Sequence, residues 1–256
     1  MRGDPSAFWG ATMIESELTL TGVPADYRIA LAKFALHVHA LSGGDLVGIS
    51  AIGGWTIDDP LYAGGGAQTA VVLAQIDLAQ LDQLATHGVR LGKQNIAAPL
   101  IMTPEYLQAS CDTFPLELLE IQQLHALIYG RDSFGELQFE RRDVRLQCER
   151  ELKSEVLQLR QGLLQAAGRR KPLLQLCRAS ATRAVRVLRG LLFLAGEKQP
   201  PALAGDVVAR VAVDTNHALP ELEAVVRGDG QPGFDTFGRF YIEIDALATY
   251  VDALPT

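Results

Sequence analysis

The sequence predicts an α+β protein, in which a layer of strands and helices is followed by a helical bundle. Short apolar runs alternate with helix-like segments in the first half of the chain, a pattern typical of a sheet covered by helices. From Val144 onward, apolar residues recur every three or four positions, which is the spacing of one face of an α-helix. The pattern changes near Phe139, so we expect two domains, an α/β domain over residues 1–138 and a helical bundle over residues 139–256.

Strands and helices are expected to alternate through the first domain. A helix over residues 25–41 follows Pro24 and ends at a Ser-Gly-Gly sequence. Asp77 is placed to cap a helix over residues 78–86, and Pro104 stands at the first position of another. The β-branched and apolar runs predict buried strands over residues 45–52, 68–76, 98–102 and 114–121.

The second domain is expected to contain about five helices, enough for a bundle. The first runs from Val144 to Ala167 and the second starts at Pro172, after the break at Gly168. Shorter helices are expected over residues 207–213, 219–226 and 237–254. On the first helix, the residues expected to face inward are Val144, Cys148, Leu152, Val156, Leu159 and Leu163.

Composition predicts a globular protein of the cytoplasm. Of the 256 residues, 48% are hydrophobic and 21% are charged, which is sufficient for a sizeable core. We expect no membrane partner, because no apolar run approaches the ~18 residues of a membrane span. Residues 1–16 lack the basic head and apolar stretch of a signal peptide. The spacing of Cys111, Cys148 and Cys177 fits buried thiols rather than a metal site or disulfide framework.

Charge is distributed unevenly along the chain. Residues 1–138, 139–198 and 199–256 carry net charges of −9, +8 and −6, which together give −7. A basic middle segment is compatible with a polyanion such as nucleic acid, but no aromatic cluster accompanies it for base stacking. We therefore expect no nucleic-acid partner. Instead, Arg141, Arg142 and Arg145 are expected to pair with acidic groups of the first domain.

Three segments carry a resemblance to a known superfamily: APLIMTPEYL (98–107), DTFPLELLEIQQLHALIYGRD (112–132) and VRLQCERELKSEVLQLRQGLL (144–164). With the order of strand, Gly turn, second strand and helical bundle, they resemble the nucleotidyltransferase-like superfamily. More specifically, they are similar to uncharacterised bacterial nucleotidyltransferase-like proteins with a C-terminal helical domain. The resemblance is closest over residues 98–168 and looser before them.

The resemblance implies a nucleotide site at a Gly turn and a metal site on the next strand. In active members, backbone amides of a Gly-Ser turn hold the phosphates, and two carboxylates spaced i, i+2 hold two metal ions. Here the turn corresponds to Gly53 and Gly54, with glycine in place of serine. The paired carboxylates correspond to Gly66 and Gln68, and neither is acidic. Without these oxygens a divalent ion loses its main ligands, so we expect neither catalysis nor a metal cofactor.

Other carboxylates could replace the missing pair. Asp58 and Asp59 follow the turn, but neighbouring residues of an extended segment point in opposite directions. Glu117 and Glu120 lie three apart on the expected fourth strand, which would allow at most one to serve. Each is also interpretable as a solvent-facing or helix-pairing carboxylate. If the enzyme were active, Mg²⁺ would be held by Asp59 and Glu117.

The histidines and the second glycine-rich segment give weaker signals. His37 and His39 would lie about 200° apart on one helix, so they are not a ligand pair. His125 follows the expected fourth strand and is interpreted as a structural histidine. Residues 64–66, three glycines, lack the Lys-Ser/Thr of a phosphate-binding loop and are interpreted as a flexible loop.

Three functional hypotheses remain at this point. The first is a degenerate, non-catalytic nucleotidyltransferase-like protein that binds a nucleotide or a partner protein. The second is an active metal-dependent transferase that moves a nucleotidyl group from a nucleoside triphosphate to a small molecule or protein. The third is a fused form of a two-protein module, in which a nucleotidyltransferase-like domain acts on a helical partner.

Overall fold

The computed structural model describes residues 17–231 and 233–255 of the chain. It confirms the α+β class, with a mixed sheet near the N-terminus and long helices in the C-terminal region. The chain divides into two compact units. Unit 1 comprises residues 17–58, 64–109 and 124–137, whereas unit 2 comprises residues 59–63, 110–123 and 138–255. The expectation about a signal peptide falls on residues 1–16, which lie outside the described residues.

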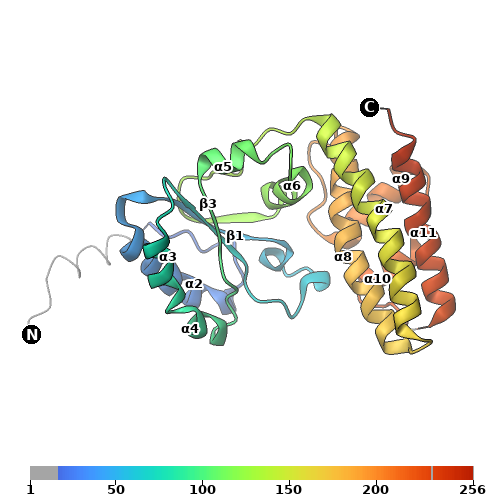
Figure 1. Ribbon diagram of the computed structural model, residues 1–256, viewed down its shortest axis with the longest axis horizontal. Helices are drawn as coiled ribbons and strands as arrows, with labels where there is room; N and C mark the ends of the chain where they lie inside the picture. Colours follow the sequence, from blue (N-terminus) through green and yellow to red (C-terminus); the bar gives the residue numbers. More distant parts are fainter. Residues whose placement is uncertain (1–16, 232, 256) are drawn as a thin grey trace, which may run out of the picture. The chain divides into compact units, whose positions relative to one another are not determined.

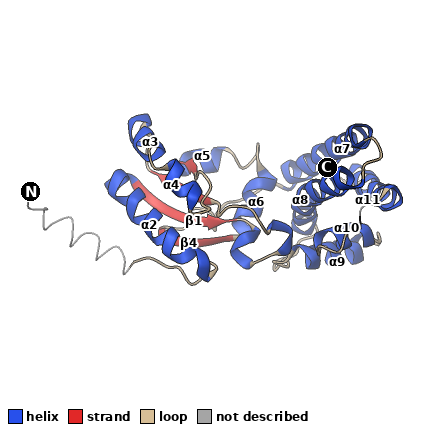
Figure 2. Ribbon diagram, turned by 90° about the horizontal axis from the view of Figure 1, so that it is seen from below, coloured by secondary structure: helices blue, strands red, loops and turns tan. Residues whose placement is uncertain are grey.

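A mixed sheet forms the centre of unit 1 (Figure 2). Among the described residues, its strands are β1 (Leu46–Ile52), β2 (Thr69–Leu73), β3 (Leu100–Met102) and β4 (His125–Gly130), in the order β3-β2-β1-β4. β2 and β3 are parallel, while β1 is antiparallel to both β2 and β4. The expected strands over 45–52, 68–76 and 98–102 are therefore confirmed, although each is shorter than expected.

Helices α2 (Ala25–Ser42), α3 (Leu78–Ala85) and α4 (Gly88–Lys93) lie on one side of this sheet (Figure 1). Leu31, Phe34 and Val38 of α2 belong to the same buried cluster as Ile49 of β1 and Val71 of β2. The predicted cap of α3 is confirmed, because the Asp77 carboxylate accepts a 2.8 Å hydrogen bond from the Ala79 amide. The predicted helix start at Pro104 is confirmed as well, by α5 (Pro104–Ala109).

The strand predicted over residues 114–121 is wrong. This segment is helix α6 (Pro115–Gln123), and the fourth strand of the sheet is β4, further along the chain. Pro115 occupies the first helical turn, where its missing amide hydrogen costs nothing. The apolar spacing of Leu116, Leu118 and Leu119 is compatible with a strand or a helix, and all three side chains are buried on α6.

Unit 2 is a helical bundle, as expected. Its long helices α7 (Arg141–Ala166), α8 (Arg170–Leu194) and α11 (Phe234–Asp252) run side by side, with α9 (Ala204–Thr215) and α10 (Pro220–Val226) beside them (Figure 1). The unit also contains α6 and the short 3₁₀ helix η3 (Pro60–Tyr62). α7 buries Val144, Cys148, Leu152, Val156 and Leu159 as predicted, whereas Leu163 is half-buried.

The three cysteines are buried. Burial raises the pKa of the Cys148 thiol to about 12 and that of the Cys177 thiol to about 11. Both are therefore uncharged thiols at neutral pH, and they pack as small apolar side chains. Within the described residues, no helix is both long and apolar enough to cross a membrane.

Candidate functional site

The Gly53-Gly54 turn lies directly after β1, where the resemblance places a nucleotide. Gly53 has a φ of 95°, a conformation that favours glycine. Its amide donates to the Leu124 carbonyl at 2.7 Å, and its carbonyl accepts from both the amide and the hydroxyl of Thr56. The Asp58 amide donates to the Trp55 carbonyl at 3.3 Å. Several backbone donors that a phosphate would need are therefore already used in hydrogen bonds within the protein.

Gly66 and Gln68, the two positions at which the resemblance would place a metal-binding pair, precede β2. The carbonyl of Gln68 accepts a 3.0 Å hydrogen bond from the Ile52 amide, which joins this segment to the end of β1. Gly66 lies against the backbone of Asn95, where an added Cβ would lie 3.1 Å from the carbonyl oxygen. All five residues of β2 are buried, and none is acidic. This strand therefore supplies no carboxylate to a metal.

Asp58 and Asp59 have different surroundings. Asp58 is exposed and has a left-handed backbone, with a φ of 53°. Asp59 is only 3% exposed, and each of its carboxylate oxygens accepts a hydrogen bond from a backbone amide. The donors are Leu61 at 2.9 Å and Ala204, the first residue of α9, at 2.6 Å. Because a helix N-terminus carries partial positive charge, the Asp59 carboxylate stabilises the start of α9.

Glu117 and Glu120 share one face of α6, contrary to the expectation for a strand. Residues three apart are neighbours on a helix surface, so both carboxylates reach Arg186 of α8. The Arg186 guanidinium donates to Glu120 at 2.8 Å and to Glu117 at 3.3 Å. The Tyr62 hydroxyl donates to the other oxygen of Glu120 at 2.9 Å. These contacts confirm that both glutamates pair with a helix, one of the interpretations that the sequence allowed.

A second arginine of α8, Arg189, lies one turn further along and is 1% exposed. Its guanidinium donates to the carbonyls of Pro201 and Ala202 and to the Gln123 side chain. Burial lowers the pKa of Arg189, but the nearby Tyr62, Glu120 and Asp59 oppose that shift. Burial and then Glu120 raise the pKa of Tyr62 well above its usual range, so its hydroxyl remains a donor. We call the group Asp59, Tyr62, Glu117, Glu120, Arg186 and Arg189 the polar cluster.

The polar cluster brings together Asp59, Glu117 and Glu120, three of the four candidate catalytic residues. Their contacts join parts of the bundle to one another. The carboxylates of the cluster are held by guanidinium groups, a hydroxyl and backbone amides. Among the described residues, no group of three or more His, Cys, Asp or Glu side chains is placed to hold a metal ion. Sequence reasoning did not find Tyr62, Arg186 or Arg189. The available signal was the three-residue spacing of Arg183, Arg186 and Arg189, which places the three arginines near one face of the helix.

His125 is a structural residue, as expected. It is the first residue of β4, and its Nε2 atom lies 3.1 Å from the Asp132 carboxylate. The imidazole is 12% exposed and lies next to the Phe134 ring. This contact connects β4 to the turn that follows it, where Asp132 also accepts hydrogen bonds from the Phe134 and Gly135 amides.

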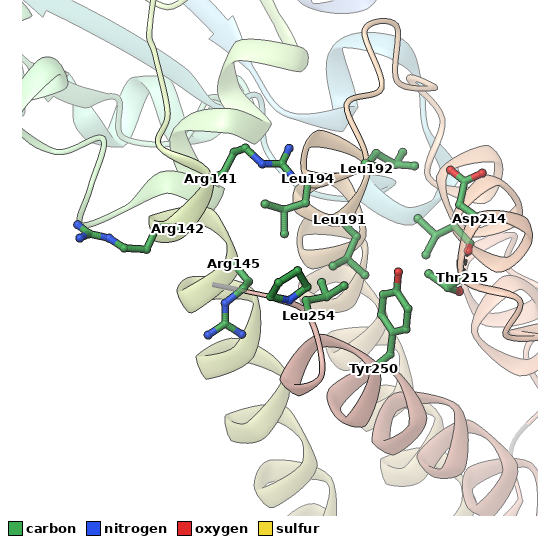
Figure 3. A pocket seen from close by; sticks show the side chains of 13 residues that line it. Arg141, Arg142, Arg145, Leu191, Leu192, Leu194, Asp214, Thr215, Tyr250 and Leu254 are labelled. Carbon is green, nitrogen blue, oxygen red and sulfur yellow. Dashed lines mark hydrogen bonds between the residues drawn. The ribbon is translucent and has the colours of Figure 1, made fainter.

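A cavity of about 460 Å³ lies in the bundle, among α7, α8, α9 and α11 (Figure 3). Its volume falls in the range of ligand pockets. The Arg141 side chain extends toward Leu194, and the Tyr250 hydroxyl points into the space between the labelled side chains, whereas Arg142 points away from them. The remaining lining residues are Arg145, Leu191, Leu192, Ala195, Val211, Asp214, Thr215, Leu254 and Pro255.

The arginines at this cavity do not pair as expected. Arg142 and Arg145 form 3.2 Å ion pairs with Asp143 and Glu149 of their own helix. Within the described part of the chain, Arg141 forms no ion pair. The expected pairing between the basic segment and acidic residues before 138 occurs instead at Arg186, with Glu117 and Glu120.

Asp214, on the other side of the cavity, is already paired with Arg210 at 3.0 Å. Arg141 is therefore the cation most available to a ligand, so the arrangement suits a molecule with an apolar body and an anionic group.

Comparison with known proteins adds no relative to this description. No protein-family model matches the chain, and no curated protein matches it. The fold and the site therefore define the class as an α+β protein with a mixed sheet, a helical bundle and a buried polar cluster within that bundle.

Proposed function

We propose that this chain is a nucleotidyltransferase-like protein of the bacterial cytoplasm that does not transfer nucleotides and instead binds a ligand. One observation supports the loss of catalysis above all others: three of the four candidate carboxylates, Asp59, Glu117 and Glu120, are already used in the polar cluster. Asp59 accepts two backbone amides, and Arg186 binds both Glu117 and Glu120. A magnesium ion would have to displace these partners before it gained its oxygen ligands.

The bundle cavity supports a nucleotide as the ligand. Arg141 has a guanidinium group suited to a phosphate, and Tyr250 offers a ring and a hydroxyl to a base or sugar. The apolar walls of α8 and α9 would cover the rest of the molecule. A partner protein is the other ligand that the sequence allows, but a concave space of about 460 Å³ favours a small molecule.

Transfer and metal binding test the loss of catalysis. With ATP labelled in its nucleotidyl group and Mn²⁺, we expect no labelled product, and calorimetry with Mn²⁺ alone should show no tight binding. Asp59→Asn should lower the free energy of unfolding by about 1–3 kcal/mol, because a buried amide loses its acceptor. The Mn²⁺ titration should be unchanged by that substitution. If Asp59→Asn or Glu117→Gln abolished a clear Mn²⁺ signal, the active-transferase hypothesis would replace this one.

Binding of AMP in the absence of metal tests the ligand. We expect Arg141→Gln to weaken AMP binding about tenfold, since a charge-assisted hydrogen bond contributes about 1.5–3 kcal/mol. Arg150→Gln is the matched control, because it removes the same charge from an exposed residue of the same helix that does not line the cavity. Isothermal titration calorimetry compares the two. Equal weakening by both substitutions would indicate general attraction to the basic segment and would contradict a site in the cavity.

A further inference from the structure

A second cavity, of about 420 Å³, lies in unit 1 between α2 and α4. All of its titratable lining residues are basic: Lys33 and His37 come from α2, and His87 and Arg90 come from α4 and the residue before it. The remaining lining residues are Phe34, Leu36, Ala40, Leu91 and Gln94. Four basic groups therefore surround a cavity whose other walls are mostly apolar.

The two imidazoles are in direct contact. The ring centroids of His37 and His87 lie 3.8 Å apart, with an angle of 61° between the ring planes. The Nε2 atom of His37 is buried and has no hydrogen-bond partner. Buried polar atoms in native proteins nearly always have one, so an orphan such as this indicates a missing partner.

Within the described residues, no acidic side chain lines this cavity. The elements packed against α2 are α3, β1 and the 3₁₀ helix η1 (Gly43–Asp45). Their titratable residues are Asp82 on α3 and Asp45 on η1, and β1 has none. α2 itself also carries Asp26, Tyr27, Arg28 and His39, which do not line the cavity. Neither Lys33 nor Arg90 forms an ion pair within the described residues, so the cluster has no internal counter-charge.

We propose that this cavity binds the phosphate group of a small molecule, with His37, His87 and Arg90 as its principal donors and Lys33 at its edge. The inference goes beyond the proposed function, because this cavity lies in unit 1 and shares no residue with the bundle cavity or the polar cluster. Arg90 and Lys33 would repel a metal cation, but they complete the binding of an oxyanion. The apolar walls and the volume suit an organic phosphate better than inorganic phosphate alone.

Phosphate binding should be coupled to protonation of the imidazoles. In the ligand-free protein, burial lowers the pKa of His37, and His87 and Arg90 lower it further. A bound phosphate adds negative charge beside both rings, which favours their charged forms and opposes this shift. Protons are therefore taken up on binding, and affinity should rise as the pH falls from 8 to 6.

The same linkage has a consequence for stability. Because the His37 pKa is lower in the folded than in the unfolded protein, the unfolded state binds the proton more readily. The ligand-free protein should therefore lose stability as the pH falls below about 6.5, the ordinary pKa of histidine. Phosphate should restore part of this loss.

The chain contains five histidines, so proton NMR can follow each imidazole in the full-length protein. With inorganic phosphate as the probe, we expect the imidazole signals of His37 and His87 to shift and the pKa of His37 to rise, whereas the signals of His39, His125 and His217 should not move. His→Gln variants assign the signals. Comparison of inorganic phosphate, AMP and adenosine identifies the source: AMP binding more tightly than phosphate indicates an organic phosphate, and adenosine should not shift the two imidazole signals.

A matched pair of variants locates the site. We expect Arg90→Gln to weaken phosphate binding about tenfold, measured by the same NMR titration, and Lys93→Gln to change it less than twofold. Both residues lie on α4 and are exposed, but only Arg90 lines the cavity. Thermal unfolding of both variants checks that they fold. Equal weakening by the two variants, no movement of the His37 and His87 signals, or a response to Zn²⁺ but not to phosphate would each overturn the proposal.

Discussion

Replacing Arg189 by Ala is expected to lower the free energy of unfolding by about 3–5 kcal/mol, the usual cost of breaking a buried charged contact. Arg189 is 1% exposed, and its guanidinium satisfies the carbonyls of Pro201 and Ala202. Alanine would leave these acceptors without a donor and would also remove a positive charge that interacts with Tyr62. Chemical unfolding in urea, monitored by circular dichroism, measures the loss.

Two further variants separate the contributions. Arg189→Met retains most of the buried volume without any donor, so it should lose less stability than Arg189→Ala. Arg142→Ala removes an arginine whose side chain is 79% exposed, and it should cost about 0–1 kcal/mol. A loss below about 1 kcal/mol for Arg189→Ala would show that water replaces the guanidinium, and that the polar cluster does not stabilise the bundle.

The bundle was predictable because its signal is local and long. Apolar residues repeat at helical spacing from Val144 to Leu159, and one helix face must be buried whatever it packs against. The first helix begins at Arg141, three residues before the predicted start at Val144. The prediction missed this start because the first three residues of the helix are charged and do not show the apolar repeat. The break between α7 and α8 was predictable from Gly168, which has a φ of 75°.

Segment 114–121 was misread because short apolar runs do not distinguish a strand from a helix. Phe-Pro-Leu-Glu-Leu-Leu-Glu-Ile fits both periods, and its β-strand interpretation ignored that Pro115 suits a helix start better than a central strand. On a strand, Glu117 and Glu120 would point to opposite faces. On the helix they share a face, so their common contact with Arg186 could not be predicted.

The remainder of the polar cluster depends on contacts between residues far apart in the sequence. Asp59 reaches the Ala204 amide across 145 residues, and Tyr62 reaches Glu120 across 58. Local patterns carry no information about such partners. The candidate acidic residues could therefore be identified from the sequence, whereas their arginine and amide partners could be identified only from the structure.

Leu152→Ala is expected to lower the free energy of unfolding by about 2–5 kcal/mol. Leu152 is 1% exposed and lies in the middle of α7, in the cluster that α7 forms with α8 and α11. Truncation removes buried methyl groups and leaves a cavity that the surrounding helices fill incompletely. The lost burial of these groups and the cavity both lower the free energy of unfolding, and the two costs add. Leu157→Ala is the control on the same helix, since Leu157 is 58% exposed and should cost far less. Urea unfolding of both variants gives the comparison, and a loss below about 0.5 kcal/mol for Leu152→Ala would show that this face of α7 does not form the core.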